Sequence, residues 1–160
     1  MFNTDLYIDR TIPDVALADA FGRAYGVSAD QVAVVDQDDH EGLGDAWRQP
    51  GVRLLLRTSR LRGDFPAAVE LMVREDTPDL HALLQRAAQN LDASILTDEL
   101  DVTPHSDLEW LMFTPDGHSA IIHADDEDFG AEDPAIVLTP KSRALYKAHC
   151  PPAGHIASLA

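Results

Sequence analysis

The sequence predicts an α+β fold: a mainly antiparallel sheet built from hairpins, with two principal helices packed on one face and a short C-terminal helix. Runs that alternate polar and apolar residues occur in adjacent pairs, as in hairpins. Two longer segments repeat apolar residues at helical spacing. The 160 residues are enough for one domain with a buried core. We expect residues 1–150 to form that domain and residues 151–160, which contain two prolines and a glycine, to form a loose tail.

The first elements expected along the chain are a strand, a helix and a second strand. Residues 5–9 alternate polar and apolar side chains, which predicts the first strand. Residues 13–25 carry apolar side chains at helical spacing, and Gly26 is placed to end that helix. Residues 32–36 are rich in valine and predict the second strand. Residues 37–51 are polar and acidic, so we expect a loop there.

The middle of the chain predicts a hairpin followed by a helix. Residues 52–60 and 66–75 are alternating runs joined by turn-forming residues 61–64. The helix that follows is the clearest in the sequence, with Thr77 as the expected N-cap. Its apolar stripe consists of Leu80, Leu83, Leu84, Ala87 and Leu91.

The last part of the chain predicts a second hairpin and a final helix. The strongest hairpin pattern is two alternating runs around Pro115-Asp116-Gly117, in which Pro presets the turn and Gly accepts its left-handed position. The elements expected here are strands over residues 94–97, 109–114, 118–124 and 135–139 and a helix over residues 141–149.

Negative charge is concentrated in the second half of the chain. The net charge is −16, and residues 76–160 hold 15 acidic but only 4 basic residues. No Lys or Arg lies between Arg86 and Lys141, whereas 13 acidic residues fall in those 54 positions. We call residues 87–140 the acidic tract. Because the strongest predicted hairpin lies inside it, we expect the tract to be a folded surface and not a disordered tail.

The composition argues against several kinds of partner and location. An acidic surface repels the phosphates of nucleic acids and anionic membranes. No apolar run reaches the ~18–20 residues of a membrane-spanning helix, and the N-terminus lacks the apolar centre of a signal peptide. The single cysteine, Cys150, cannot form an intrachain disulfide. We therefore expect a cytoplasmic monomer or homodimer that binds neither nucleic acid nor membrane.

No motif predicts catalysis, a bound metal or a cofactor. The acidic run that begins at Asp125 fails the EF-hand pattern for calcium because Phe129 occupies a ligand position. The seven histidines show no metal-binding spacing on a helix, and His118 and His123 are expected on opposite faces of one strand. Cys150 is interpreted as an incidental thiol. The sequence thus predicts no catalytic residue, no metal ligand and no cofactor.

Two further features concern the surface. Four arginines fall within ten positions and form what we call the arginine cluster: Arg53, Arg57, Arg60 and Arg62. The cluster offers an anion-binding patch, but pairing with the neighbouring acidic residues is the simpler interpretation. Of the two tryptophans, Trp110 is expected in or near the core, and Trp47, in the predicted loop, is expected to contact a partner.

These observations favour a protein-binding function. In size, acidity and lack of catalytic motifs the chain is similar to small bacterial immunity proteins, a similarity of composition only. We expect an immunity- or inhibitor-like domain whose acidic C-terminal half binds a basic protein. The expected binding residues are Asp98, Glu99, Asp101, Asp107, Glu109, Asp125, Asp126, Glu127, Asp128 and Trp47. The alternatives are a scaffolding or dimerising module that uses an uncovered sheet edge or face, and a small metal-dependent enzyme that uses the Asp, Glu and His loops.

Overall fold

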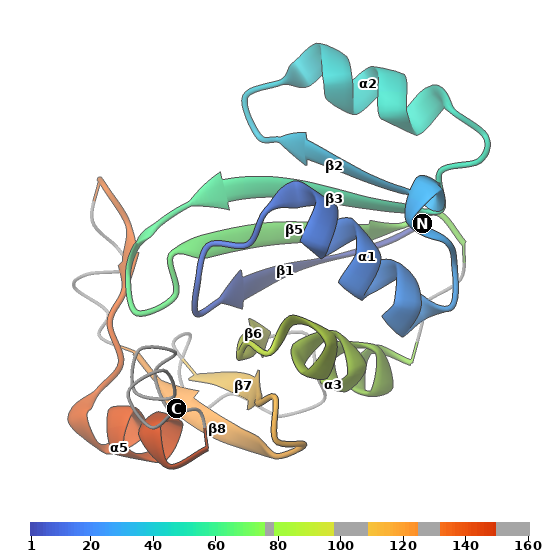
Figure 1. Ribbon diagram of the computed structural model, residues 1–160. Coiled ribbons are helices and arrows are strands. Elements are labelled where there is room, and N and C mark those ends of the chain that lie inside the picture. The colour runs from blue at the N-terminus through green and yellow to red at the C-terminus, as the bar shows by residue number, and fades with distance from the viewer. Residues whose placement is uncertain (76–78, 98–108, 125–131, 150–160) are drawn as a thin grey trace.

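The computed structural model describes residues 1–75, 79–97, 109–124 and 132–149. In these residues a seven-stranded sheet has the order β2-β3-β5-β1-β6-β7-β8 (Figure 1). A second, two-stranded sheet pairs β4 with β9. The strands are β1 (Phe2–Ile8), β2 (Val32–Asp36), β3 (Leu54–Arg60), β4 (Arg62–Gly63), β5 (Ala67–Val73), β6 (Ile95–Thr97), β7 (Glu109–Phe113), β8 (Ser119–His123) and β9 (Ala135–Ile136). The helices are α1 (Asp14–Tyr25), the 3₁₀ turn η1 (Ala29–Gln31), α2 (His40–Arg48), α3 (Leu80–Leu91) and α5 (Pro140–His149).

The large sheet is mainly antiparallel. Every neighbouring pair of its strands runs antiparallel except β2 with β3. The expected hairpins are present as β3–β5 and β7–β8. The α+β class predicted from the sequence is therefore confirmed.

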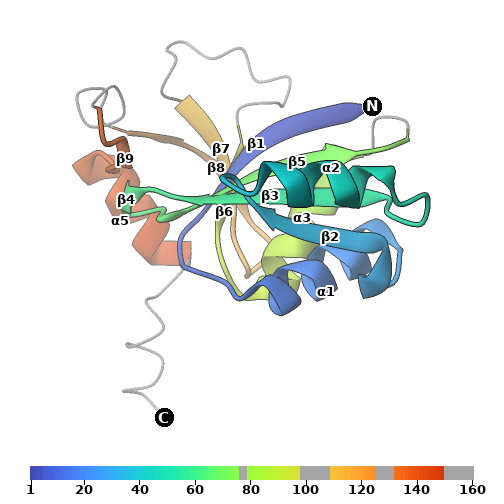
Figure 2. The same ribbon diagram turned by 90° about the horizontal axis from the view of Figure 1, so that it is seen from above.

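Helices α1 and α3 lie on the same side of the large sheet (Figure 2). The strands beneath them point alternate side chains at the helices, as half-buried strands do. Leu6 of β1 and Leu71 of β5 meet Phe21 of α1 and Leu84 of α3, and all four side chains are fully buried. Burying a side chain of this size contributes about 1.5–3 kcal/mol. This layer, the principal core, accounts for most of the buried apolar residues.

Among the described residues, helices cover the opposite face of the sheet towards its two ends. Helix α2 packs on Val35 of β2 and Leu55 of β3. Helix α5 places Leu145 and Tyr146 against a cluster that includes Trp110 of β7, and we call this cluster the second core. The central strands between the two helices carry polar side chains on this face.

Helix α5 is joined to parts of the chain that are distant in sequence. The Tyr146 hydroxyl donates a hydrogen bond to Oδ2 of Asp9, at 2.8 Å, just after β1. Nη2 of Arg143 lies 2.9 Å from Oδ2 of Asp64, next to β4. The final helix is thus hydrogen-bonded to the residue that follows the first strand.

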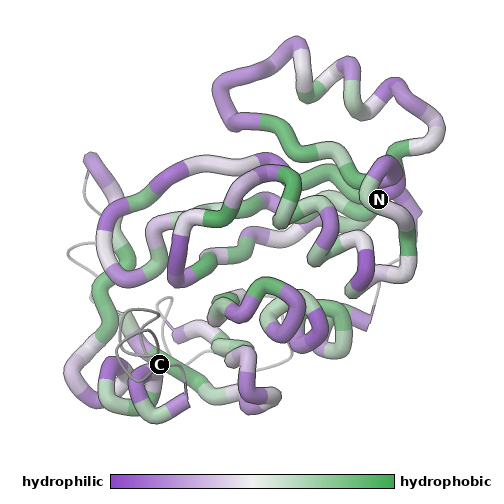
Figure 3. The backbone as a smooth tube through the Cα atoms, in the orientation of Figure 1, coloured by the Kyte–Doolittle hydropathy of each residue, from purple (hydrophilic) through white to green (hydrophobic). Residues whose placement is uncertain are grey.

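The expectation of a polar loop over residues 37–51 is wrong, because α2 lies within it. Asp39 caps the helix, accepting a hydrogen bond of 2.9 Å from the Gly42 amide. Leu43 and Trp47, four positions apart, lie on the side that faces the sheet. Figure 3 shows α2 as mainly hydrophilic with isolated hydrophobic positions, which explains why sequence patterning did not predict it. Its two glycines also lower its intrinsic helix propensity.

Several boundaries also differ from expectation, among them the first strand, which spans Phe2–Ile8 instead of residues 5–9. Helix α3 begins at Leu80 with Asp79 as its N-cap, and not with Thr77, because the Asp79 carboxylate accepts a hydrogen bond from the Ala82 amide. The last strand ends at Ile136 instead of continuing to residue 139. Among the residues that the structure describes, no helix has the length and hydropathy to cross a lipid bilayer.

Candidate functional site

Most of the acidic residues expected to bind a partner lie outside the described residues. These are Asp98, Glu99, Asp101, Asp107, Asp125, Asp126, Glu127 and Asp128. Of the expected binding residues, the structure places Glu109 and Trp47.

Glu109 and Trp47 both take part in contacts within the protein. The Glu109 side chain, at the start of β7, is only 10% exposed, and its Oε1 lies 2.8 Å from Nε2 of His123. The Trp47 ring lies over the guanidinium of Arg74, 4.4 Å from ring centroid to Cζ. The Trp47 carbonyl also accepts a hydrogen bond from Arg74. The expectation that Trp47 projects from a loop as an exposed contact is therefore wrong.

The arginines of the described residues are largely engaged within the protein. Seven of them form ion pairs with carboxylates: Arg10, Arg23, Arg48, Arg53, Arg57, Arg62 and Arg143. Arg74 and Arg86 donate to backbone carbonyls. The arginine cluster is accordingly no free positive patch, since Arg53 pairs with Glu75 and Arg57 pairs with Glu70.

Among the described residues, few of the carboxylates that pair with arginine belong to the acidic tract. Six of the seven carboxylates paired with arginine precede residue 76, and Asp133 alone belongs to the acidic tract. Two other described carboxylates of the tract, Glu109 and Asp116, contact histidines. In the part of the chain that the structure describes, ion pairs with arginine are therefore concentrated on carboxylates that precede residue 76.

The polar middle of the sheet contains a cleft of about 420 Å³. Arg57 spans it, with Nη1 3.4 Å from Oε2 of Glu70 and Nη2 donating to the Gln37 carbonyl at 3.1 Å. Nε of Arg57 is buried and has no hydrogen-bond partner among the described residues. Asp5, Tyr7 and Ser59 add to the polar lining. The described lining of the cleft is thus largely polar and contains no histidine or cysteine.

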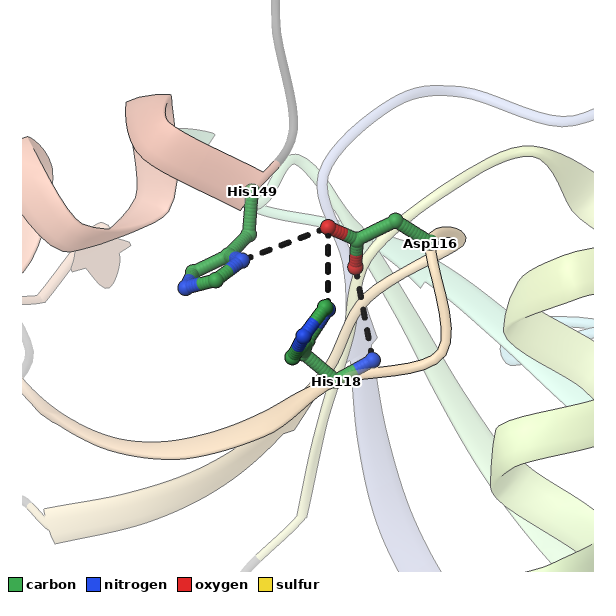
Figure 4. A group of neighbouring side chains, drawn as sticks. All are labelled: Asp116, His118 and His149. Carbon is green, nitrogen blue, oxygen red and sulfur yellow. Dashed lines mark hydrogen bonds and ion pairs between the residues drawn. The ribbon is translucent and has the colours of Figure 1, made fainter.

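A second group of polar side chains lies where the β7–β8 turn meets the end of α5. Gly117 has φ of 91°, the left-handed conformation that the sequence predicted for this turn. The turn places Asp116 and His118 side by side, and α5 brings His149 to them (Figure 4). We call Asp116, His118 and His149 the Asp–His cluster.

The Asp–His cluster is organised around one carboxylate oxygen. Oδ2 of Asp116 lies 3.1 Å from Nδ1 of His118 and 3.2 Å from Nδ1 of His149. The two imidazole centroids are 4.6 Å apart. The other oxygen, Oδ1, accepts hydrogen bonds from the hydroxyl of buried Thr114 and from the His118 amide.

The surroundings of Asp116 keep its carboxylate ionised. Partial burial alone would raise the pKa of Asp116, but hydrogen bonds from Thr114, His118 and His149 outweigh it and lower the pKa to about 2. The side chains of Asp116, His118 and His149 are 39%, 63% and 28% exposed, so a solute can reach the cluster. Among the described residues, these three side chains bring one potential ligand atom each within 4.8 Å of the others.

No protein family, characterised protein or solved structure that was compared with the chain matches it. Its function must therefore be inferred from its own residues.

Spacing rules did not predict the Asp–His cluster because His118 and His149 are 31 residues apart in sequence. The lengths of helix α5 and strand β8 could have indicated it. Ten helical residues span about 15 Å and five strand residues about 17 Å. Helix α5 starts beside the end of β8, where the Ser142 hydroxyl accepts a hydrogen bond from the His123 amide. A helix that runs back along β8 from this point ends at the β7–β8 turn. His118 precedes β8 and lies in the turn, not on the strand as expected.

Proposed function

We propose that the protein is a cytoplasmic protein-binding domain, of an immunity- or inhibitor-like kind, that engages a basic partner protein through the acidic surface of its C-terminal half. The observation that supports this most is the uneven pairing of charge. The arginines neutralise carboxylates of the first half of the chain, while 13 acidic residues in the 54 positions between Arg86 and Lys141 have no Lys or Arg among them. A surface of one sign attracts a partner of the other and accelerates association by roughly 10–10³-fold.

The alternative of a dimerising module draws on the uncovered middle of the sheet. That face carries Asp5, Arg57 and Glu70, and a stable self-association interface would have to bury these charges. The polar character of the face favours binding of a charged partner over dimerisation. Light scattering separates the two, since the proposed function is compatible with a monomer and the alternative is not.

The test compares two variants with the same change in net charge. The first neutralises four carboxylates of the acidic tract: Asp125→Asn, Asp126→Asn, Glu127→Gln and Asp128→Asn. The control neutralises four exposed carboxylates of the first half: Asp14→Asn, Asp30→Asn, Asp38→Asn and Glu41→Gln. Each protein is immobilised and exposed to lysate of its source cells at about 0.05 M and about 0.5 M salt, because surface attraction weakens as the Debye length falls.

The proposal expects one basic protein, bound stoichiometrically at low salt and released at high salt. The control variant should retain it, and the acidic-tract variant should lose at least tenfold in affinity. Absence of such a partner at low salt contradicts the proposal. Equal losses in both variants would mean that the net charge, and not the C-terminal surface, is responsible.

A further inference from the structure

The Asp–His cluster has spacing close to that of a metal coordination sphere. Ligand atoms placed about 2.0–2.1 Å from a tetrahedral zinc ion lie about 3.3–3.4 Å from one another. Two of the three separations in the cluster, from Oδ2 of Asp116 to Nδ1 of His118 and of His149, are 3.1 and 3.2 Å. The third pair of ligand atoms, both on the imidazoles, lies within 4.8 Å.

We propose that Asp116, His118 and His149 bind one divalent transition-metal ion of the zinc class, with two imidazole nitrogens and one carboxylate oxygen as the protein ligands. Imidazole nitrogen favours zinc and its neighbours over magnesium and calcium, which prefer oxygen ligands alone. Because all three side chains are partly exposed, the remaining coordination position faces solvent and is open to water or to a group of a ligand.

The carboxylate is supported in the way that metal ligands usually are. Thr114 and the His118 amide donate to Oδ1 of Asp116 and fix the carboxylate plane, which leaves Oδ2 directed at the imidazoles. Gln85 of α3 in turn donates to the Thr114 carbonyl, at 3.0 Å, and holds the turn against α3. The ligand oxygen is thus oriented before an ion arrives.

The electrostatic setting also favours a cation. His149 is the last residue of α5, where the carbonyl ends of the helix carry partial negative charge. The protein as a whole carries a net charge of −16. An ion bound here connects the β7–β8 turn to the end of α5, so binding stabilises the packing of α5 on the second core.

Calorimetric titration of the purified, chelator-treated protein with Zn²⁺ tests the proposal, with Mg²⁺ and Ca²⁺ as comparison ions. The expected result is one Zn²⁺ per chain, a raised melting temperature with Zn²⁺, and no comparable effect of the other two ions. Co²⁺ should bind in the same 1:1 ratio and give visible absorption bands of low-coordinate cobalt. No binding, or binding of all ions alike, overturns the proposal.

Variants assign the ligands. His118→Ala and His149→Ala should each weaken Zn²⁺ binding at least tenfold, while His123→Ala should not change it. His123 is the matched control because it lies on the same hairpin and also contacts a carboxylate, that of Glu109, but is outside the group of three potential ligands found among the described residues. Circular dichroism and melting in chelator show whether each variant is folded. If the affinity falls with Cys150→Ser and not with the histidine variants, the ligand set is wrong.

Discussion

The guanidinium of Arg74 holds the C-terminal end of α2 on the sheet, and replacing it tests how this unexpected helix is stabilised. Nε donates to the Val52 carbonyl at 2.8 Å, and Nη2 donates to the carbonyls of Trp47 and Gln49 at 2.5 and 3.2 Å. Two of these acceptors lie at the end of α2, where helical carbonyls lack partners within the helix. The Trp47 ring covers the same guanidinium.

The expected cost of Arg74→Ala follows from these contacts. Each hydrogen bond contributes about 0.5–1.5 kcal/mol and the cation–π contact about 0.5–1 kcal/mol. Water reaches the partly exposed site and compensates for some of the loss, so we expect the free energy of unfolding to fall by about 2–3 kcal/mol. Arg74→Lys keeps the charge but not the fork of donors and should lose about half as much.

Urea unfolding followed by circular dichroism measures the change, with Arg48→Ala as the control. Arg48 is on the same helix, and its side chain is 78% exposed and paired only with nearby Asp45, so its loss should cost less than about 0.5 kcal/mol. Hydrogen exchange should show faster exchange of the α2 amides in Arg74→Ala alone. If Arg74→Ala destabilises the protein no more than Arg48→Ala does, Arg74 does not hold α2.

Three further changes have definite expected outcomes. Gly63→Ala should lower the free energy of unfolding, measured by urea unfolding, by about 2–4 kcal/mol. The reason is that a Cβ at this position would collide with the Ile136 carbonyl and that φ is 96°. Gly51→Ala is the control, and because there is open space around Gly51 it should be close to neutral. Leu84→Ala, at a fully buried position between α3 and the sheet, should cost about 2–5 kcal/mol by the same method; a cost below about 1 kcal/mol would contradict the packing described. The pKa of Asp116 is lowered in the folded state to about 2, so its stabilising effect is present above the unfolded value of 3.8 and is lost as the pH falls through about 2. Because the Asp116 side chain is partly exposed, the stabilisation that the pKa shift implies is reduced to about 1 kcal/mol. In chelator, the difference in unfolding free energy between the wild type and Asp116→Asn should be about half as large at pH 3 as at pH 5.

Sequence patterning predicted the elements whose residues follow one clear pattern and whose ends carry residues that suit the turn or cap found there. The stripe of α3, with Leu83 and Leu84 at its centre, recurs every three or four residues and is buried as expected. The β7–β8 turn has proline and glycine at the positions that its backbone requires. In such segments the local preference and the tertiary contacts favour the same structure.

Helix α2 and the Asp–His cluster could not be predicted in the same way because both depend on distant contacts. The end of α2 is held by Arg74, which lies 27 residues after Trp47 in the chain. The cluster needs His149 to return along β8 to the turn at Asp116. Pairing of the arginine cluster with neighbouring acids was predictable, since acidic residues are abundant near each arginine, but the particular partner Glu70 depends on the register of β3 with β5.

The two cores are completed at different chain lengths. The principal core draws on residues up to Phe113, whereas the second core needs Leu145 and Tyr146 of α5. During synthesis at roughly 5–20 residues per second, about 2–7 s therefore separate the two events. In that interval the second core, which includes Trp110, lacks the side chains that α5 contributes to it.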